Sequence, residues 1–400
     1  MTKTRNFNIR TICLWLLPWY PILQMYYVGS LSLGFLIFTP MLMVMFTEKR
    51  RLKKDKSLMT FFFTLVGIEF IQLVLPYTSA ITISHNLVMQ TISLLSIICF
   101  ANYIKYDEFL RPYIFACIIM IAGMFYQVYQ LFVLHSFLNG PIVLFPSLIA
   151  ENNVYTGDTI MRPMSFFQEP QAFCSYIIVF VIFMLQERKY LLAGIATLAI
   201  LLSTSTEGLV LSGLVWILFV MFSNSSVWMK GLVAALFFGL ASLYTSLELF
   251  SVGFDKATNT DYGENVRLVT GFRVLGDMDG LGWLFGMGTT PNSFYQLMSS
   301  KYGDGDVNTV LYFSSATGAF INYGIFVGIA YWIFLIKKMV YKYKMVFILG
   351  VCLCVMPFAQ TCFWSSTFVY LFSMYYMCLN HCEEQGLQTI STKRLQVSKH

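Results

Sequence analysis

The chain has 400 residues, of which 57% are hydrophobic and only 12% charged, and its mean hydropathy is +0.67. This small number of polar residues cannot cover the surface of several soluble domains. The composition therefore indicates an integral membrane protein and excludes a separate soluble catalytic domain of ordinary size. The net charge of +6 would favour a nucleic-acid partner only if the basic residues formed one patch. They are spread over short loops, and the densest run, at 49–56, is expected to anchor the topology, so no nucleic acid is expected.

Apolar stretches of sufficient length predict about twelve membrane helices. In chain order they fall at 11–28, 30–47, 58–76, 86–104, 112–135, 171–186, 190–205, 206–222, 231–250, 314–336, 345–362 and 364–380. Two long hydrophilic loops, 136–170 and 251–313, follow the fifth and ninth spans, and a polar tail covers 381–400. We therefore expect an all-α polytopic membrane protein whose residues 1–400 form a single membrane domain.

Basic residues predict which loops face the cytoplasm, because Lys and Arg near the end of a span resist translocation. If the N-terminus is inside, all but five of the 26 Lys and Arg fall in segments predicted to be cytoplasmic. The five on the other side are Arg162, Lys256, Arg267, Arg273 and Lys301. Both termini and the tail 381–400 are therefore expected in the cytoplasm, and both long loops on the extracytoplasmic side.

The cysteines and histidines do not form a metal-binding pattern. Cys378, His381 and Cys382 lie together near the end of the last predicted span, but no second set of ligands lies nearby. A helix end facing the cytoplasm explains them better than a metal cluster. We therefore expect no metal and no other cofactor.

The first long loop ends in a segment, 161–173, that contains two candidate functional residues. Arg162 is the loop's only basic residue, and a cation is a costly choice on the translocated side. A salt bridge from Arg162 to Glu151, Asp158 or Glu169 explains it as well as ligand binding does. Glu169 precedes a proline at the predicted start of a helix, where unpaired N–H groups favour a carboxylate.

The second long loop contains more acidic than basic residues, so its net charge does not favour anion binding over the whole loop. Its segment 265–275 predicts a short amphipathic helix, with Leu268, Phe272 and Leu275 on one face. Arg267 and Arg273 lie six residues apart and would point in different directions on a regular helix. One of them is expected to meet a ligand while the other braces the loop.

A glycine-dense segment, 280–288, follows in the same loop and contains Gly286 and Gly288. Such a segment allows tight turns, and its N–H groups could bind a phosphate. The pattern alone is weak evidence, because glycine-rich segments outside membranes are usually turns.

Two acidic residues lie in or beside the predicted spans. Glu69 is at membrane depth, where an ionisable side chain is by default a functional candidate, although Gln72 three residues later could satisfy a protonated carboxyl. Glu207 lies at the outer turn between the spans 190–205 and 206–222, close to the face that carries the long loops.

These residues and this topology resemble the Wzy-type O-antigen and capsular polysaccharide polymerases, relatives of the O-antigen ligases. The segment from Arg162-Pro163 to Glu169-Pro170 resembles the family's Arg-Pro…Glu-Pro segment before a span. Further similarities lie at Leu201 to Leu209, at Arg267, at Gly286-Met287-Gly288 and at Asn322 to Gly328, in the order in which the family carries its motifs. The resemblance therefore covers the overall plan and several local patterns.

The sequence departs from the family in two places. Thr206 stands where many relatives have arginine, so a charge contact at that junction is missing or supplied elsewhere, with Glu207 a candidate. The histidine that ligases carry near the end of the large loop has no counterpart between Lys301 and Tyr323. This second departure favours a polymerase over a ligase.

The resemblance implies a membrane glycosyltransferase of cell-envelope polysaccharide biosynthesis in the bacterial cytoplasmic membrane. Such an enzyme transfers a growing glycan from undecaprenyl diphosphate to a lipid-linked repeat unit at the outer face. Its partners would be undecaprenyl-diphosphate-linked oligosaccharide and membrane lipid, together with a chain-length regulator and a flippase.

The resemblance also implies roles for the candidate residues. Arg162, Arg267 and Glu169 would be catalytic, and Arg273, Gly286, Gly288 and Glu207 would bind substrate. Aromatic residues of the loops could stack on sugars or cover the membrane surface: Tyr262, Trp283, Phe294, Tyr295 and Tyr302.

A multispan transporter or a flippase for lipid-linked oligosaccharide is the chief alternative, and an O-antigen ligase is another. A transporter predicts related halves and ionisable or unwound sites in mid-membrane, whereas a polymerase predicts basic residues in long loops at the outer face. The two halves of this sequence do not place their long loops at corresponding positions, which favours the polymerase.

Overall fold

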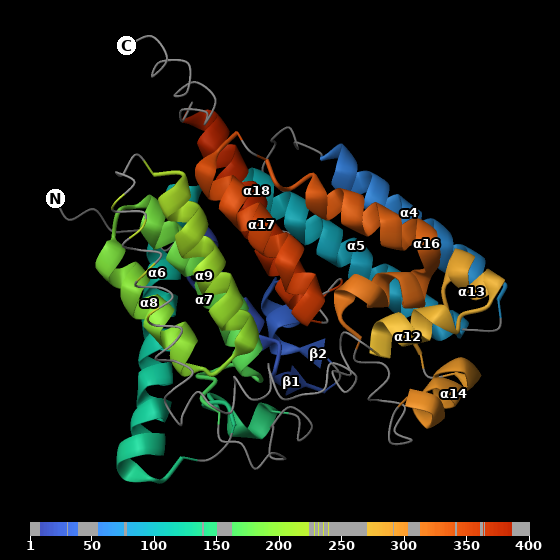
Figure 1. The fold of residues 1–400 in the computed structure, drawn as a ribbon, viewed down its shortest axis with the longest axis horizontal. Helices are drawn as coiled ribbons and strands as arrows, with labels where there is room; N and C mark the ends of the chain where they lie inside the picture. The colour runs from blue at the N-terminus through green and yellow to red at the C-terminus, as the bar shows by residue number, and fades with distance from the viewer. Residues whose placement is uncertain are drawn as a thin grey trace. The chain divides into compact units, whose positions relative to one another are not determined.

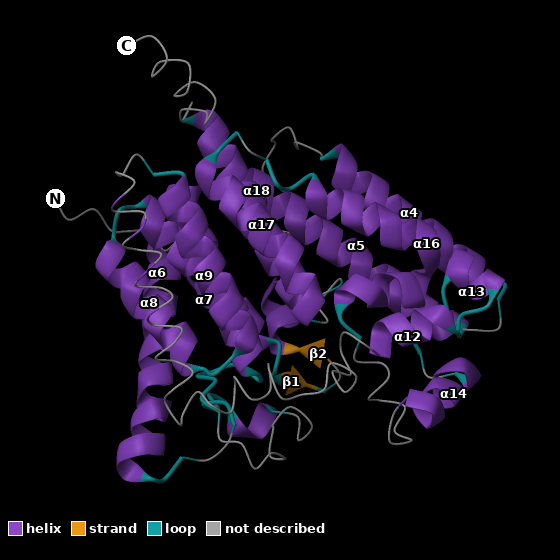
Figure 2. Ribbon diagram, in the orientation of Figure 1, coloured by secondary structure: helices purple, strands orange, loops and turns teal. Residues whose placement is uncertain are grey.

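The computed structural model describes most of the predicted spans and part of each long loop. The described residues are 9–29, 31–38, 55–75, 78–137, 140–149, 162–223, 270–290, 292–302, 313–340, 342–360, 363 and 365–385, with single positions at 228, 231, 235 and 239. They are mostly helical (Figure 2). Apart from positions 231, 235 and 239, the predicted span 231–250 lies outside this part of the chain, and so do Arg267 and Tyr262.

The chain divides into two compact units. Unit 1 comprises Met1–Leu52, Leu95–Phe237 and Tyr370–Leu387, and unit 2 comprises Lys53–Leu94, Phe238–Val369 and Gln388–His400. Two helices, α5 (Ala80–Tyr103) and α18 (Ser366–Glu384), contribute residues to both units (Figure 1).

The remaining elements belong to one unit each. Those of unit 1 are α1 (Ile9–Leu16), the 3₁₀ helix η1 (Leu17–Trp19), α2 (Tyr20–Leu23), β1 (Tyr27–Val28), β2 (Leu31–Ser32), α6 (Tyr106–Tyr129), the π-helix η2 (Gln130–Leu134), the 3₁₀ helix η3 (Pro146–Leu148), α7 (Pro170–Gln186), α8 (Tyr190–Leu202) and α9 (Thr206–Met221). Those of unit 2 are α4 (Lys56–Gln72), α12 (Gly271–Gly276), α13 (Gly280–Phe285), α14 (Ser293–Tyr302), α16 (Ser315–Ile336) and α17 (Lys344–Ala359).

The helical class is confirmed, but the count of about twelve spans is not. Helices α4 to α9 and α16 to α18 coincide with predicted spans to within a few residues at most ends. Among the described residues, three helices are long and apolar enough to cross a membrane: α5, α6 with its π-helical extension, and α16. Several other apolar helices are shorter, so the described chain suggests a membrane protein without fixing the number of crossings.

The first predicted span, 11–28, is wrong as a continuous helix. Helix α1 ends at Leu16, and the chain then passes through a 3₁₀ helix and the four-residue helix α2. Pro18 and Pro21 explain the interruption, because proline lacks the N–H that a helix interior requires. The short antiparallel pair β1–β2 follows, with Gly29 at φ +63° in its turn.

Unit 1 is built around α7. This helix is apolar on all sides, and the residues from Phe173 to Leu185 are all buried. It packs against α6 (teal in Figure 1) and against α8 and α9 (green to yellow-green). Two tyrosines join its neighbours, since the hydroxyl of Tyr113 donates to the carbonyl of Tyr176 at 3.0 Å and the hydroxyl of Tyr176 donates to that of Pro18 at 2.5 Å. A helix that is hydrophobic all round is expected at the centre of a bundle.

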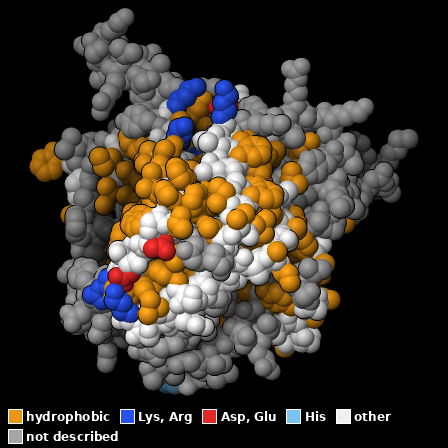
Figure 3. All heavy atoms as spheres, turned by 90° about the vertical axis from the view of Figure 1, so that its right-hand side faces the viewer, with side chains coloured by type: hydrophobic (Ala, Val, Ile, Leu, Met, Phe, Trp, Pro, Cys, Tyr) orange, Lys and Arg blue, Asp and Glu red, His pale blue; other side chains and the backbone are white. Residues whose placement is uncertain are grey.

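Unit 2 is built around the antiparallel pair α4 and α16. Phe61 of α4 stacks on Phe334 of α16 with ring centroids 5.3 Å apart. The outer side of α16 carries a stripe of exposed apolar residues, Phe326, Ile329, Ile333 and Ile336. On the face shown in Figure 3, hydrophobic side chains dominate and charged side chains gather in a few places. Such a surface fits a lipid environment better than water.

Several contacts at the helix ends join segments that the charge pattern predicts to lie on the same side of the membrane. In unit 1 the hydroxyl of Tyr106 bonds Glu187 at 3.2 Å and its ring packs on His381. In unit 2 Lys338, after α16, forms an ion pair with Asp55, before α4. All five residues lie in or at the edge of segments predicted to be cytoplasmic. Which side of a membrane they face stays a prediction.

Candidate functional site

The tight turn between α8 and α9 holds Arg162 in unit 1. Thr204 has a left-handed backbone with φ +55°, a conformation that is rare outside glycine. The guanidinium of Arg162 binds this residue twice, with Nε donating to Thr204 Oγ1 at 3.3 Å and Nη2 to the carbonyl oxygen at 3.0 Å. The structure therefore brings the end of the first long loop to a turn that lies 42 residues further along the chain.

The same turn carries Glu207 and several small polar groups. Ser205 caps α9 by accepting from the N–H of Gly208 at 3.3 Å, and Glu207 follows in the first helical turn with its side chain buried. The hydroxyl of Ser175 donates to Glu207 at 3.5 Å. The buried Cys174 of α7 also lies at this turn, with its Sγ 3.1 Å from the hydroxyl oxygen of Ser203. Arg162 and Glu207, two of the predicted site residues, therefore both lie at the α8–α9 turn of unit 1.

Gln127 of α6 positions the segment that begins with Arg162. Its Oε1 accepts from the N–H groups of Met164 and Ser165 at 2.8 and 2.6 Å, and its Nε2 donates to the carbonyl of Gly140 at 2.9 Å. The hydroxyl of Ser165 donates to the carbonyl of Met120 at 2.6 Å. Gln127 is not among the residues predicted from the sequence. An amide side chain within an apolar stretch was the signal that could have identified it.

Glu169 lies at the N-terminus of α7, as predicted. It is the N-cap residue, Pro170 is the first helical residue, and the carbonyl of Glu169 accepts from the N–H of Phe173 at 3.3 Å. Its carboxylate makes no capping hydrogen bond to the first turn, and as the N-cap residue it stands at the positive end of the helix dipole.

The Arg162 turn depends on a close contact between α9 and α7, which gives a testable prediction. A Cβ at Gly208 would lie 2.5 Å from Cys174 Sγ and 2.8 Å from Ile200 Cγ2. We expect Gly208→Ala to lower the free energy of unfolding by about 1–3 kcal/mol through overpacking. The measurement is reversible unfolding of the purified protein in detergent. Gly194→Ala in α8 is the control, because nothing lies within 4 Å of its added Cβ, and equal effects of the two would contradict the prediction.

In unit 2, Gly286 and Gly288 join α13 to α16 through their backbones. Both have φ +79°, which favours glycine. The N–H of Gly286 donates to the carbonyl of Gly282 at 2.7 Å and that of Gly288 to the carbonyl of Asn322 at 3.1 Å. Both N–H groups therefore have protein partners, which gives the glycines a structural role. Their role in substrate binding stays a prediction.

The predicted helix 265–275 is described only from residue 270 onward. Helix α12 begins at Gly271, with Leu275 buried and Phe272 55% exposed, so the predicted apolar face is not uniformly buried. Arg273 is exposed in the last turn of α12, where a cation suits the helix dipole. Arg267 lies outside the described residues, so its position relative to Arg273 stays untested.

The aromatic residues of the second loop serve different purposes. Tyr295 is fully buried and its hydroxyl donates to the carbonyl of Gly288 at 2.7 Å, so it belongs to the core and cannot stack on a sugar in this structure. Phe294 and Tyr302 pack against the same core. On the exposed side, Lys301 pairs with Asp277 at 2.7 Å, and this contact lowers the pKa of the Asp277 carboxyl.

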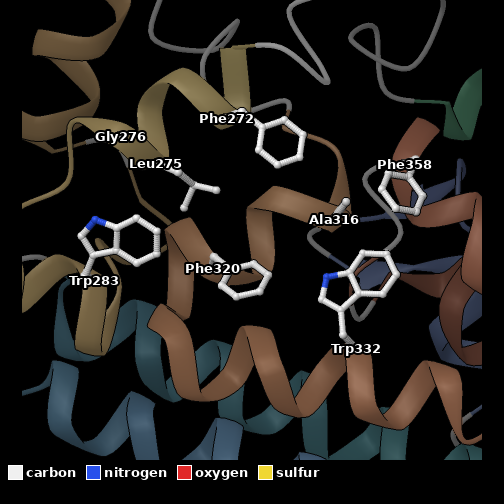
Figure 4. A pocket seen from close by; sticks show the side chains of 8 residues that line it. All are labelled: Phe272, Leu275, Gly276, Trp283, Ala316, Phe320, Trp332 and Phe358. Atoms are coloured by element: carbon white, nitrogen blue, oxygen red, sulfur yellow. The ribbon is translucent and has the colours of Figure 1, made fainter.

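Trp283 contributes to an apolar groove of about 640 Å³ in unit 2 (Figure 4). The groove is lined by Phe272, Leu275, Gly276, Trp283, Ala316, Phe320, Trp332 and Phe358. Trp332 of α16 and Phe358 of α17 pack with ring centroids 5.1 Å apart. Because its walls come from two apolar helices and from loop helices, this groove suits an apolar chain better than a sugar.

Glu69 lies in the last turn of α4 and is completely buried in unit 2. The prediction that Gln72 would satisfy it is wrong. Nε2 of Gln72 donates to the carbonyls of Phe285 and Asn322 at 2.6 and 2.7 Å, and Gln90 of α5 instead donates to Glu69 Oε1 at 2.7 Å. Gln72 bonds the Asn322 carbonyl because α16 is broken at Gly324. The break leaves that carbonyl outside the helical hydrogen-bond ladder.

Comparisons of the chain with protein-family models, with curated proteins and with solved structures found no match. Among the described residues, no group of three His, Cys, Asp or Glu side chains could hold a metal ion.

Proposed function

We propose that the protein is a polysaccharide polymerase that transfers a growing glycan from a lipid diphosphate carrier to a lipid-linked repeat unit. The observation that carries this proposal is the hydrogen-bonded fixation of Arg162 on the Thr204 turn, beside the buried Glu207. These segments lie 42 residues apart in the sequence, and both contain residues that the family resemblance assigns to one site. A fixed cation of this kind suits a reaction whose main requirement is charge stabilisation.

The chemistry assigns a clear task to the arginine. When the acceptor hydroxyl attacks the anomeric carbon, the bond to the lipid diphosphate breaks and negative charge grows on the departing oxygens. Arginine stays protonated and its planar guanidinium binds phosphate oxygens bidentately. Arg162 is proposed to bind the leaving group, with Arg267 and Arg273 assisting from the second loop. Glu169 is proposed to orient an arginine or to accept the hydroxyl proton.

The apolar groove of unit 2 supports the same substrate class. Its lining offers almost no polar group, and a volume of about 640 Å³ can hold part of a long hydrocarbon chain. Undecaprenyl diphosphate carries such a chain. The proposal places the protein in a bacterial cytoplasmic membrane, with the reaction on the outer face and with a flippase and a chain-length regulator as partners.

A flippase or transporter is a second candidate because of one observation in unit 2. Helix α16 contains a non-helical residue, Gly324 with φ +80° and ψ −178°, next to the buried carboxylate of Glu69 on α4. Broken helices and buried carboxylates near a membrane are typical of transporters.

Reconstitution separates the two candidates. Purified protein in vesicles receives one lipid-linked repeat unit, and the glycan products are separated on a gel. A ladder of longer glycans supports the polymerase. Movement of intact lipid-linked sugar across the vesicle without chain growth selects the flippase and overturns the polymerase.

In the same assay, Arg162→Ala is expected to lower the polymerisation rate by about 10²-fold, because it removes a charge contact made to the leaving group in the transition state. Arg162→Lys is expected to recover only part of the rate, since lysine lacks the bidentate fork. Lys301→Ala is the matched control, as this cation of the second loop is paired with Asp277 at the surface. Full polymer yield from Arg162→Ala would remove Arg162 from the mechanism.

A further inference from the structure

Glu69 is a buried carboxylate without a cationic partner in the described part of the chain. None of its surface is exposed, and two cations of unit 2, Lys301 and Lys338, are paired with Asp277 and Asp55 instead. Lys338 meets α4 at its N-terminal end, whereas Glu69 lies in its last turn. An isolated carboxylate in such a site is strongly unfavourable unless a positive charge accompanies it.

Among the described residues, two oxygen atoms at this site have no hydrogen-bond donor as a partner. They are Oε2 of Glu69 and Oε1 of Gln90, and Gln90 is 3% exposed. The two side chains are joined through Gln90 Nε2 and Glu69 Oε1 at 2.7 Å. Both remaining atoms are acceptors, which a neutral donor, a proton on the carboxyl or a cation would satisfy. Only a proton or a cation would also balance the buried negative charge of Glu69.

The neighbouring polar groups are neutral. Asn86 and Gln90 come from α5 and Tyr323 from α16, and all three interact with the Glu69 carboxylate. Next to Tyr323 lies Tyr295 of α14, whose hydroxyl oxygen is 2.8 Å from Asn322 Oδ1. Within the described chain, the titratable residues named at this site are Tyr323 and Tyr295, which are uncharged near neutral pH and cannot balance a carboxylate.

We propose that Glu69 and Gln90 form a binding site for one small monovalent cation, either a proton or a sodium ion. Carboxylate and amide oxygens are ligands that suit hard cations, and a proton on the carboxyl would equally remove the buried charge. The broken helix α16 and the end of α13 meet beside this site through Gln72, so occupancy is expected to stabilise the junction between the helical core and the second loop. This inference does not depend on the proposed glycan transfer.

Sodium binding is tested by thermal unfolding of the full-length protein in detergent, in sodium chloride against choline chloride at equal ionic strength. If the occupant is sodium, the unfolding temperature of the wild type is expected to rise by about 2 °C or more at saturating sodium. Glu69→Gln, which keeps the shape and removes the charge, is expected to lose this rise. Glu207→Gln, which alters a different buried carboxylate and lies in unit 1, is expected to retain the rise in unfolding temperature.

A proton as the occupant gives a different result. Unfolding is then expected to be the same in both salts, and infrared spectra are expected to contain the carbonyl band of a protonated carboxyl that Glu69→Gln removes and Glu207→Gln retains. Gln90→Leu provides a second variant, which leaves the carboxylate in place and is expected to weaken sodium binding or to shift the carboxyl band. The proposal is overturned if sodium has no specific effect and no carboxyl band depends on Glu69.

Discussion

Asp55→Ala is expected to lower the free energy of unfolding by about 3–5 kcal/mol, because it leaves the ammonium of Lys338 buried without its partner. The Lys338 side chain is only 3% exposed, and burial lowers its pKa while Asp55 opposes that shift. Asp55 also caps α4, where its Oδ1 accepts from the N–H of Ser57 at 2.7 Å. Loss of this cap adds about 1 kcal/mol. The measurement is unfolding of the purified protein by a denaturing detergent.

The other partner of this pair is expected to behave differently. Lys338→Met removes the buried charge itself, and the remaining Asp55 carboxylate is 26% exposed and retains its hydrogen bonds to α4. We expect a change of no more than about 1 kcal/mol, since buried ion pairs can often be replaced by apolar side chains at little cost. In the Lys338→Met background, Asp55→Asn removes the carboxylate charge and keeps an oxygen that can cap α4. This variant therefore separates the contribution of the N-cap from that of the charge. Equal losses from Asp55→Ala and Lys338→Met would contradict this asymmetry.

Gly324→Ala is expected to destabilise unit 2 by about 4 kcal/mol or to prevent folding, because two separate costs add. Its backbone, with φ +80° and ψ −178°, belongs to a region that is open almost exclusively to glycine. An added Cβ would also collide with the carbonyl oxygen of Leu284 in α13. Gly286→Ala is expected to have a similar effect, since its Cβ would collide with the Asn322 carbonyl. Expression level and free energy of unfolding are the measurements.

Gly67→Ala in α4 is the matched control for these two variants. Nothing lies within 4 Å of its added Cβ, and alanine is the better helix former by about 1 kcal/mol. We expect this variant to be as stable as the wild type or slightly more stable. A small effect of Gly324→Ala, comparable to that of Gly67→Ala, would show that α16 is not broken at this position.

Local sequence features correctly predicted most helices of the described chain. Continuous apolar residues between 171 and 186 predicted α7, and the Glu169-Pro170 pair predicted its start. These features act over one or two helical turns, so they can be recognised without knowledge of the fold. The broken first span shows the limit, because Pro18 and Pro21 were visible in the sequence and the apolar composition outweighed them in the prediction.

Partners that lie far apart in the chain could not be predicted in the same way. Local spacing suggested Gln72 for Glu69, since side chains three residues apart share a helix face. In the structure Gln90 donates to Glu69, while Gln72 donates to carbonyl groups at the break in α16. No residue near either glutamine in the sequence indicates that break.

The sequence by itself determined the apolar helices, the sparse cations of the predicted outer loops and the candidate residues Arg162, Glu169 and Glu207. Only the tertiary structure decided that Arg162 binds the Thr204 turn and that Glu69 is enclosed with Gln90. The physical reason is that burial and helix propensity are properties of neighbouring residues. The partner of a buried polar group is instead set by competition among all groups that packing brings within hydrogen-bonding distance.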